Sequence, residues 1–243
     1  MTKKRVELQT ELLYGLHPVH EVLLARRRKL VRLYTTKPEP KGFAQIKKLI
    51  QNQRVPIQYV PRATLASMAQ TTDHQGVVAY AAPYPFRKKP FDTQKHPFLI
   101  MLDGIQDPRN LGAILRSAYC IGVDGAMVTQ KQSAPLNAVA LKSSAGLAER
   151  LEIMMVPSAQ AAVHLLKESG YSLYLATTDK AHNALEVSYA KPLCVVIGSE
   201  GQGITTAILH EGERIQLPQV ADDVSYNASV AAGILLFLIR HRI

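Results

Sequence analysis

The sequence has few cysteines and no long hydrophobic run. Its two cysteines, Cys120 and Cys194, lie far apart, so they form neither a CxxC pair nor a disulfide framework. This spacing argues against structural zinc and favours a reducing, cytoplasmic location. No stretch reaches the roughly 18 apolar residues that a membrane-spanning helix needs. The basic start of the chain is not followed by the apolar segment of a secretory signal peptide.

Acidic residues are scarce in the first two fifths of the chain. Residues 1–97 hold 18 Lys and Arg against 6 Asp and Glu, a net charge of +12, whereas residues 98–243 carry −2. A basic first module favours a polyanionic partner such as nucleic acid, although basic surfaces can also serve solubility alone. The apolar content of 47% excludes a wholly disordered chain, and 243 residues suffice for one large domain or two smaller ones.

A Pro-rich, charged segment marks a boundary between two domains. Residues 83–97 contain four prolines and the basic run at 87–89, and proline disfavours helix and removes backbone donors. We therefore expect a semi-rigid linker over 83–97, between a small α/β domain at 1–82 and a second domain at 98–243. In the first domain the pattern predicts helices at 17–25, 42–53 and 62–69, and strands at 30–34, 57–60 and 76–81.

Strongly apolar strands alternate with helices in the second domain. Strands are expected at 98–102, 125–128, 151–156, 171–176, 193–197 and 214–217, and helices at 111–120, 134–143, 158–167, 205–210 and 226–240. This alternation predicts an α/β fold with a mostly parallel sheet covered on both faces. The last helix is apolar on every side over residues 228–239 except at Ser229, so it should pack against the sheet and against something else, plausibly a second subunit.

The first of three polar clusters contains Asp107, Asn110 and Arg116. An apolar strand ends at Asp103 and a helix is expected to begin near Asn110. Ligands of open α/β sheets bind beyond the carboxyl ends of the strands, where this turn lies. Asn110 could equally be the N-cap of the helix, and Arg116 could form a surface ion pair of little energetic weight.

The other two clusters follow later strands. The segment Gly198–Gly203, Gly-Ser-Glu-Gly-Gln-Gly, places three glycines within six residues, which lets the backbone approach a ligand closely. It is neither a P-loop nor a dinucleotide fingerprint. The third cluster spans residues 222–229, where Ser225 or Asn227 is expected to open the last helix.

Together the clusters resemble the three motifs of the SpoU-type RNA ribose 2′-O-methyltransferases of the SPOUT class, in order and spacing. Residues 14–21 and 74–77 resemble the substrate-binding domain of these enzymes, which is similar to ribosomal protein L30e. The resemblance implies S-adenosylmethionine as cofactor, a deep trefoil knot in the C-terminal domain and a homodimer with the last helix in its interface. It further implies methylation of a guanosine ribose in 23S ribosomal RNA. Alternatives are a transfer RNA substrate and a non-catalytic RNA-binding assembly factor; the missing dinucleotide fingerprint disfavours a nucleotide-binding metabolic enzyme.

The resemblance also implies site residues. The catalytic set is Asn110, Arg116, Glu200, Ser225 and Asn227. The cofactor set is Thr177, Gly198, Glu200, Gly203, Ile215, Leu217, Ser225, Asn227 and Ser229. RNA contacts are expected from Arg26, Arg27, Arg28 and Lys29, whose run of charge makes a natural phosphate grip or a helix end, and from Arg109 and Arg116. No metal is expected.

Arg116 is not expected to act as a literal base, because a guanidinium keeps its proton up to a pKa of about 12 or more. It is expected to hold a substrate phosphate while a neighbouring oxygen takes the proton of the ribose hydroxyl. Glu200 is expected to orient Arg116 or Asn110. The sequence departs from the usual family pattern at Tyr226, where Leu is common, at residues 146–148, and at Asp222 and Asp223. The last departure bears on affinity for the cofactor.

Overall fold

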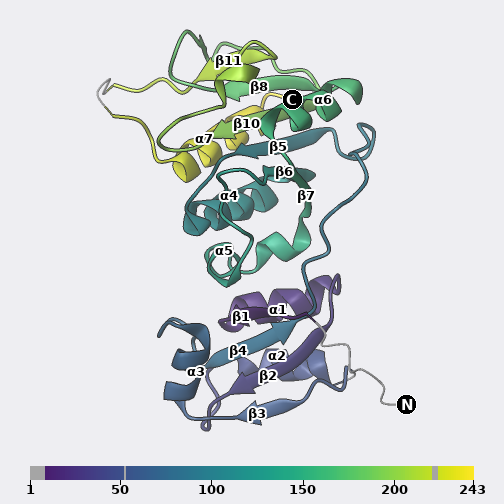
Figure 1. The fold of residues 1–243 in the computed structure, drawn as a ribbon, viewed down its shortest axis with the longest axis vertical. Helices are drawn as coiled ribbons and strands as arrows, with labels where there is room; N and C mark the ends of the chain where they lie inside the picture. Colours follow the sequence, from purple (N-terminus) through teal and green to yellow (C-terminus); the bar gives the residue numbers. More distant parts are fainter. Residues whose placement is uncertain (1–8, 52, 221–223) are drawn as a thin grey trace. The chain divides into compact units, whose positions relative to one another are not determined.

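The computed structural model describes residues 9–51, 53–220 and 224–243, so Asp222 and Asp223 lie outside the described residues. The chain forms two compact units, one of Met1–Pro85 with Asn137–Glu149 and one of Phe86–Leu136 with Arg150–Ile243 (Figure 1). The proline pattern places residues 137–149 in the second domain, whereas their contacts place them in the first unit. Residues 82–97 contain no helix or strand, but Tyr84 and Phe91 are only 4% and 5% exposed, so each side chain anchors this segment in its own unit.

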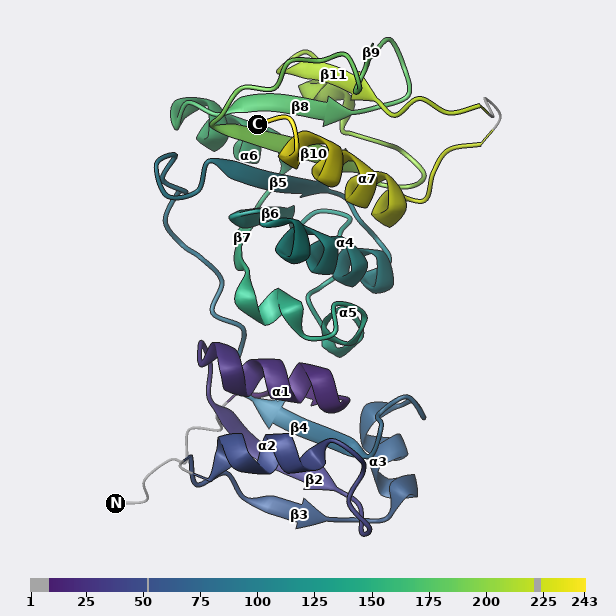
Figure 2. The same cartoon turned by 180° about the vertical axis from the view of Figure 1, so that it is seen from behind.

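The first unit contains a four-stranded sheet with the order β1-β4-β2-β3. Its elements are β1 (Glu11–Tyr14), α1 (Leu16–Ala25), β2 (Leu30–Thr35), α2 (Phe43–Ile50), β3 (Ile57–Tyr59), α3 (Arg62–Ala69), β4 (Val77–Ala81) and α5 (Ala138–Ser143). Strand β1 is absent from the sequence prediction. Phe43, Ile46 and Ile50 form the buried stripe that makes α2 a helix against the sheet, and α2 lies in front of the sheet in Figure 2.

The second unit contains a seven-stranded sheet with the order β7-β6-β5-β10-β8-β11-β9. Its strands are β5 (Phe98–Asp103), β6 (Gly125–Thr129), β7 (Glu152–Val156), β8 (Ser172–Ala176), β9 (His182–Asn183), β10 (Leu193–Gly198) and β11 (Glu213–Gln216). Every neighbouring pair is parallel, so the predicted α/β fold with a mostly parallel sheet is confirmed. Strands β5, β6 and β10 are buried at every position, as expected for strands covered on both faces.

Helices cover both faces of this sheet. Helices α4 (Pro108–Ile121) and α7 (Ala228–Arg240) lie side by side in front of the sheet in Figure 2, and α6 (Ala159–Glu168) lies behind it. Alternate residues of β5, Leu99 and Met101, join the core cluster under α6. Three expected helices are clearly shorter: α2 ends at Ile50, α5 begins at Ala138, and the segment after Gly203 forms only the 3₁₀ turn η2 (Thr206–Ile208). A second 3₁₀ turn, η1, spans Leu147–Arg150.

Helix α7 keeps an apolar face uncovered within this chain. Val230, Ile234 and Phe237 are 48%, 40% and 58% exposed, although Leu235, Leu236 and Ile239 are buried against the unit. The apolar helix therefore packs on one side, as predicted, whereas its other apolar side has no cover within the described chain. None of the helices in the described ranges is long and apolar enough to cross a membrane.

Candidate active site

A cavity of about 410 Å³ lies at the carboxyl ends of β8, β10 and β11 in the second unit. This is the edge where open α/β sheets bind ligands. The beginning of α7 closes its far side through Ala228, Ala231 and Leu235. Thr177 follows β8, and its backbone N–H donates to the Ile215 carbonyl across 3.0 Å, which joins two of the strand ends that form the wall.

The Gly198–Gly203 loop forms a second wall, and geometry requires glycine at two of its positions, Gly198 and Gly203. Ser199 and Gly203 exchange backbone hydrogen bonds of 3.0 Å, which fold the loop tightly back on itself. A Cβ on Gly198 would collide with the backbone of Gly203 and Ile204, and Gly203 has φ of +66°. A Cβ on Gly201 or Gly203 would meet only open space, so these positions leave the backbone open to a ligand.

Helix α4 positions Asn110 beside this loop. Asp107 is the N-cap, because its Oδ1 accepts from the backbone N–H of Arg109 at 2.8 Å, and Pro108 occupies the first helical position. The possibility that Asn110 caps the helix is therefore wrong. Its side chain is free for another role, and its Nδ2 donates to Glu200 Oε1. The strands that precede the two residues are neighbours in register at Asp103 and Gly198, which explains their approach.

Asn227 connects the third cluster to the first. It is the N-cap of α7, since its Oδ1 accepts from the backbone N–H of Ser229 at 3.0 Å and from the Ser229 hydroxyl at 2.6 Å. Its Nδ2 donates to Asn110 Oδ1 at 3.2 Å. One hydrogen-bonded chain thus runs from Glu200 through Asn110 and Asn227 to Ser229, and it links the three motif segments, which are far apart in the sequence.

The structure brings most of the expected cofactor residues to the cavity wall. Those that line it are Thr177, Gly198, Glu200, Gly203, Ile215, Leu217 and Ser225. Asn227 and Ser229 do not line it and instead lie in the hydrogen-bonded chain next to it. Arg109 and Arg116 are exposed on α4 outside the cavity wall, and in the described part of the chain no polar partner holds the Arg116 guanidinium.

Several residues at the site are absent from the expected set. Thr178, Leu209, Gln216 and Tyr226 also line the cavity, and Tyr226 is 43% exposed. Asp103 is 6% exposed, and its Oδ2 accepts from the backbone N–H of Thr205 at 2.8 Å, which fixes the chain that leaves the glycine loop. An acidic residue at the end of an otherwise apolar strand is the sequence signal that could have identified this role.

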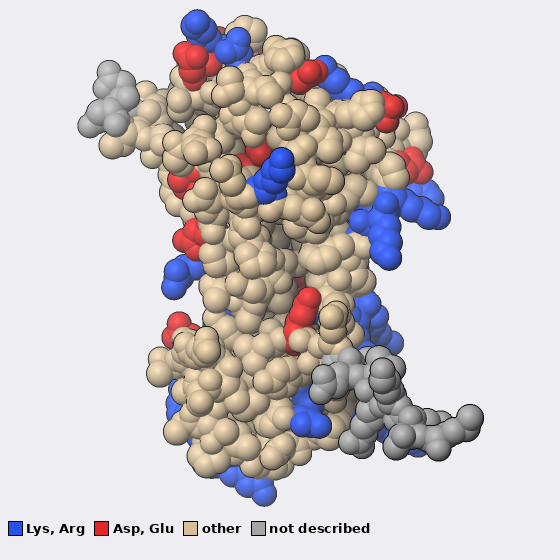
Figure 3. All heavy atoms as spheres, viewed as in Figure 1, with Lys and Arg blue, Asp and Glu red and all other residues tan. Residues whose placement is uncertain are grey.

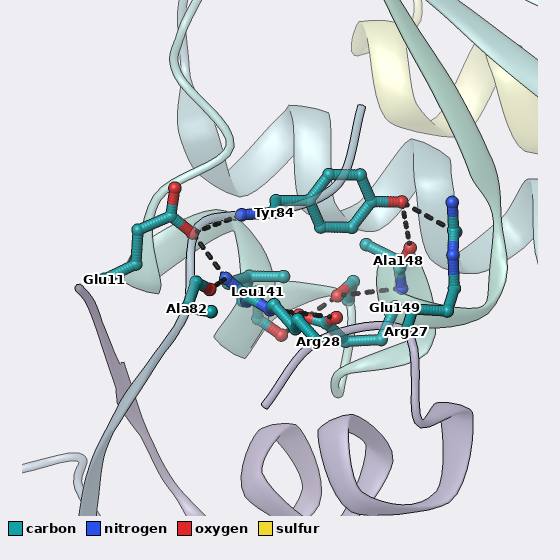
Figure 4. A network of polar contacts seen from close by, with 9 residues as sticks. Glu11, Arg27, Arg28, Ala82, Tyr84, Leu141, Ala148 and Glu149 are labelled. Atoms are coloured by element: carbon teal, nitrogen blue, oxygen red, sulfur yellow. Dashed lines mark hydrogen bonds and ion pairs between the residues drawn. The ribbon is translucent and has the colours of Figure 1, made fainter. Parts of the chain in front are cut away.

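The basic run of the first unit does not act as one surface. Arg26 and Lys29 are exposed and Arg27 is half-buried, but the Arg28 side chain is 1% exposed. Arg28 Nη2 lies 2.5 Å from Glu149 Oε1, and Nη1 lies 2.5 Å from Glu11 Oε2 and 3.0 Å from the Ala82 carbonyl (Figure 4). Arg28 is therefore unavailable to a phosphate, and its assignment as an RNA contact is wrong.

Comparison with known proteins identifies matching families over both units. Residues 97–237 match the model of the SpoU rRNA methylase family, and residues 12–87 match the RNA 2′-O ribose methyltransferase substrate-binding family. The chain is 34% identical to a protein of Staphylococcus haemolyticus named as a TrmH family tRNA/rRNA methyltransferase, over 82% of this chain and 85% of that one. It is 31% identical to a 23S rRNA (guanosine-2′-O-)-methyltransferase of Photorhabdus laumondii, over 94% of this chain and 96% of that one.

Solved structures share the whole fold. An AdoMet-bound rRNA methyltransferase of Sinorhizobium meliloti superposes with a TM-score of 0.81 at 20% identity, over 98% of this chain and 90% of that one. An RNA 2′-O ribose methyltransferase superposes with a TM-score of 0.84 at 20% identity, with the same coverage. From the family models, the relatives and the shared fold it follows that this chain belongs to the SpoU rRNA methylase family and is an S-adenosylmethionine-dependent RNA 2′-O-ribose methyltransferase.

Proposed function

We propose that this enzyme methylates the ribose 2′-hydroxyl of a guanosine in 23S ribosomal RNA, in the cytoplasm. The observation that carries the proposal is the hydrogen-bonded chain from Glu200 through Asn110 to Asn227, beside a cavity suited to a small cofactor. The choice of substrate is supported by the Photorhabdus laumondii relative, whose name states this reaction and whose likeness extends over 94% of the present chain.

The residues around the cavity fit S-adenosylmethionine. Its volume of about 410 Å³ is within the usual range for small-ligand sites. Ile197, Ile204 and Leu209 supply apolar wall, whereas Thr177, Glu200 and the open backbone at Gly201 supply polar groups. The bound cofactor supplies an activated methyl group on a sulfonium centre. The protein therefore has to place the attacking hydroxyl in line and assist the loss of its proton.

Asn110 is fixed for a positioning task. Its Nδ2 is directed to Glu200 and its Oδ1 accepts from Asn227, so both ends of the amide are held and its orientation is set. Glu200 thus orients Asn110, one of the two partners expected for it. In this proposal the Asn110 amide and Ser225, a residue of the cavity wall, hold the ribose at the cavity.

Arg116 is proposed to hold an RNA phosphate next to the reacting ribose. Its exposed guanidinium, free of a polar partner in the described residues, can offer two parallel donors to a phosphate. We expect Arg116→Ala to abolish methyl transfer while cofactor affinity measured by calorimetry changes little. Arg116→Lys is the matched control, which keeps the charge but loses the bidentate geometry, so it should retain only part of the activity. Lost cofactor affinity with turnover retained at saturating cofactor would contradict this role.

Two other functions are separated by one assay. The enzyme is incubated with labelled S-adenosylmethionine and total RNA from a strain that lacks its gene, and the labelled nucleotide is mapped. We expect label at a guanosine of 23S rRNA. Label in transfer RNA would instead favour a transfer RNA substrate. The name of the Staphylococcus haemolyticus relative, which covers both tRNA and rRNA, leaves this substrate open. Absence of label in every RNA would favour a non-catalytic assembly factor.

We further propose that the chain acts as a homodimer through its C-terminal domain, with a trefoil knot around the cofactor site. The dimer is supported by an apolar groove between α4 and α7, lined by Ile121, Ile234, Phe237 and Leu238, and by the exposure of Phe237. Among the residues that the structure describes, no charged side chain lines this groove. An uncovered apolar face of this kind is typical of a subunit interface.

A further inference from the structure

The sheet of the first unit has one face that is covered only in part. Leu33 and Thr35 of β2 are fully buried on the face that α2 covers. On the opposite face α3 covers one end of the sheet, where Leu65 and Ala69 pack on Tyr14 and Val78. Figure 1 looks onto this opposite face, with α3 at one end of the sheet and α2 behind it. Ala138 of α5 and Tyr34 pack against the same cluster. Elsewhere on this face Arg32 is exposed and Tyr80 is half-buried.

Two tyrosines and an arginine occupy the accessible part. Arg32 of β2 pairs with Tyr80 of β4, and Tyr34 follows two residues later on the same face. The Tyr34 and Tyr80 rings are edge-to-face, with centroids 6.1 Å apart and planes at 76°. Arg32 Nη1 donates to the Tyr34 hydroxyl at 3.1 Å. Both tyrosines are half-buried and Arg32 is exposed, so the group is fixed at its base and open to solvent.

The charge on this face suits an anion. Within the described part of the chain, no carboxylate pairs with Arg32. On the neighbouring strand β1 it is Leu12 that pairs with Tyr80, so Glu11 lies on the other face of the sheet, where Arg28 and the backbone N–H of Tyr84 engage its carboxylate. Residues 1–97 carry a net charge of +12. Figure 3 shows the same side of the molecule, where the surface of the first unit is mostly uncharged, with a few isolated charged side chains of either sign.

We propose that Tyr34, Tyr80 and Arg32 form a platform that binds an unpaired nucleotide of the RNA substrate. This inference rests on the proposed function. A base stacks on the tyrosine rings and the adjacent phosphate pairs with the Arg32 guanidinium. Aromatic side chains on an open sheet are suited to unpaired bases, since bases inside an A-form duplex do not expose their faces. The site would select single-stranded segments or loops of the RNA substrate.

The chain offers a matched control on the other face of the same sheet. Tyr59 of β3 pairs with Thr35, so its side chain lies on the α2 side, and it is 39% exposed. Its hydroxyl donates to Glu39 at 2.7 Å, and Lys37 Nζ lies 4.6 Å from its ring centroid. Tyr59 is therefore an exposed tyrosine near positive charge that lacks the paired ring and the open platform.

The test measures binding of a fluorescent oligouridylate to the full-length enzyme by anisotropy. Tyr80→Leu and Arg32→Gln should each weaken binding about 5- to 100-fold, as expected for loss of one stacked base or one phosphate contact. Tyr34→Phe should bind nearly as wild type because it retains the ring, and Tyr59→Leu should do the same. Binding of a blunt RNA duplex should be unchanged in every variant. Far-UV circular dichroism and the midpoint of thermal unfolding show whether each variant is folded.

Separate measurements distinguish this inference from the proposed function. Methyl transfer to total RNA is measured for wild type and for each variant, and the platform variants should raise KM for RNA with kcat retained. Unchanged oligouridylate binding in folded Tyr80→Leu and Arg32→Gln, or an equal loss in Tyr59→Leu, would overturn the platform even if the enzyme methylates RNA. Absence of methyl transfer by wild type, with oligouridylate binding that depends on Tyr80, would overturn the proposed function and leave the platform standing.

Discussion

Arg28 is a charged side chain that the first unit buries together with one of its counter-ions, Glu149. Its side chain and that of Glu149 are each 1% exposed, and two contacts of 2.5 and 3.2 Å join them (Figure 4). Removing one partner of a buried pair leaves the other charge uncompensated, which costs about 3–5 kcal/mol. We expect Arg28→Met to lower the free energy of unfolding by this amount, measured by urea denaturation.

The neighbouring residue provides the control for this prediction. Lys29 is exposed, so Lys29→Met should change the free energy of unfolding by no more than about 0.5 kcal/mol. The double variant Arg28→Met with Glu149→Leu should recover much of the stability, because neither charge then remains buried alone. Equal effects of Arg28→Met and Lys29→Met would show that Arg28 is not a structural cation.

Residue type alone could not separate Arg28 from its three basic neighbours. Helix α1 ends at Ala25, and Arg26 adopts a left-handed conformation with φ of 52°. The chain then enters β2, and the turn directs Arg28 inward between Glu11 and Glu149. Glu149 lies more than a hundred residues further along the sequence. Such long-range pairing has no local signal, whereas the run of four charges is visible at once.

His74 is expected to make the stability of the first unit depend on pH. Its side chain is fully buried, and Nδ1 accepts from the backbone N–H of Gly76 at 3.0 Å, so the neutral ring carries its proton on Nε2. Burial, and then the nearby positive charge of Arg62 and Lys142, lower its pKa. The unfolded chain therefore binds a proton more readily than the folded chain below a pH of about 6.5.

Stability should accordingly fall as the pH drops from about 6.5 towards the lowered pKa of His74. Urea unfolding at several pH values measures this slope. His74→Gln, which cannot titrate, should flatten it, whereas the exposed His164 replaced by Gln should leave it unchanged. A slope that persists in His74→Gln would assign the pH dependence to other groups.

At the scale of an element, the start of α7 combines a helix cap with the active site. Asn227 Oδ1 caps the helix, and its Nδ2 holds Asn110. Asn227→Asp keeps the cap oxygen but loses the amide donor, so it should retain stability and lose most methyl transfer. Asn227→Ala loses both functions and should also lower the free energy of unfolding by about 1 kcal/mol. Equal activity of Asn227→Asp and wild type would remove Asn110 positioning from the proposal.

The central strands of the second unit could be predicted well because they are continuous apolar runs, whereas β9, which is only His182–Asn183, has no such signal and is absent from the prediction. Strand β10, expected at 193–197, spans Leu193–Gly198, and α6 begins after Ser158 as expected. Strand β1 was missed because Glu11–Tyr14 is only four residues long and owes its conformation to pairing with β4. The start of α4 was misplaced although Asp107 followed by Pro108 is a local cap signal.

At the scale of the whole molecule, the sequence order of segments does not state which unit each one joins. Residues 137–149 follow β6 in the chain, yet Ala138 packs in the core cluster with Tyr14 and Leu65. The first stretch of the first unit ends at Pro85, within the proline-rich segment, but one boundary cannot describe a unit built from two stretches of chain. The three motifs of the site, by contrast, were recognisable because each is local.

The proposed dimer makes a prediction at the same scale. Phe237 is 58% exposed in the apolar groove of α4 and α7, and a charge placed there would have to be buried without a partner on association. We expect wild type to sediment as a dimer at micromolar concentration and Phe237→Glu to sediment as a monomer with an unchanged circular dichroism spectrum. Leu24→Glu, which alters an apolar residue 39% exposed on α1 of the first unit, is the control and should remain dimeric. A monomeric wild type would remove the interface, and a dimeric Phe237→Glu would place it elsewhere, because no stable apolar interface accommodates two unpaired carboxylates at its centre.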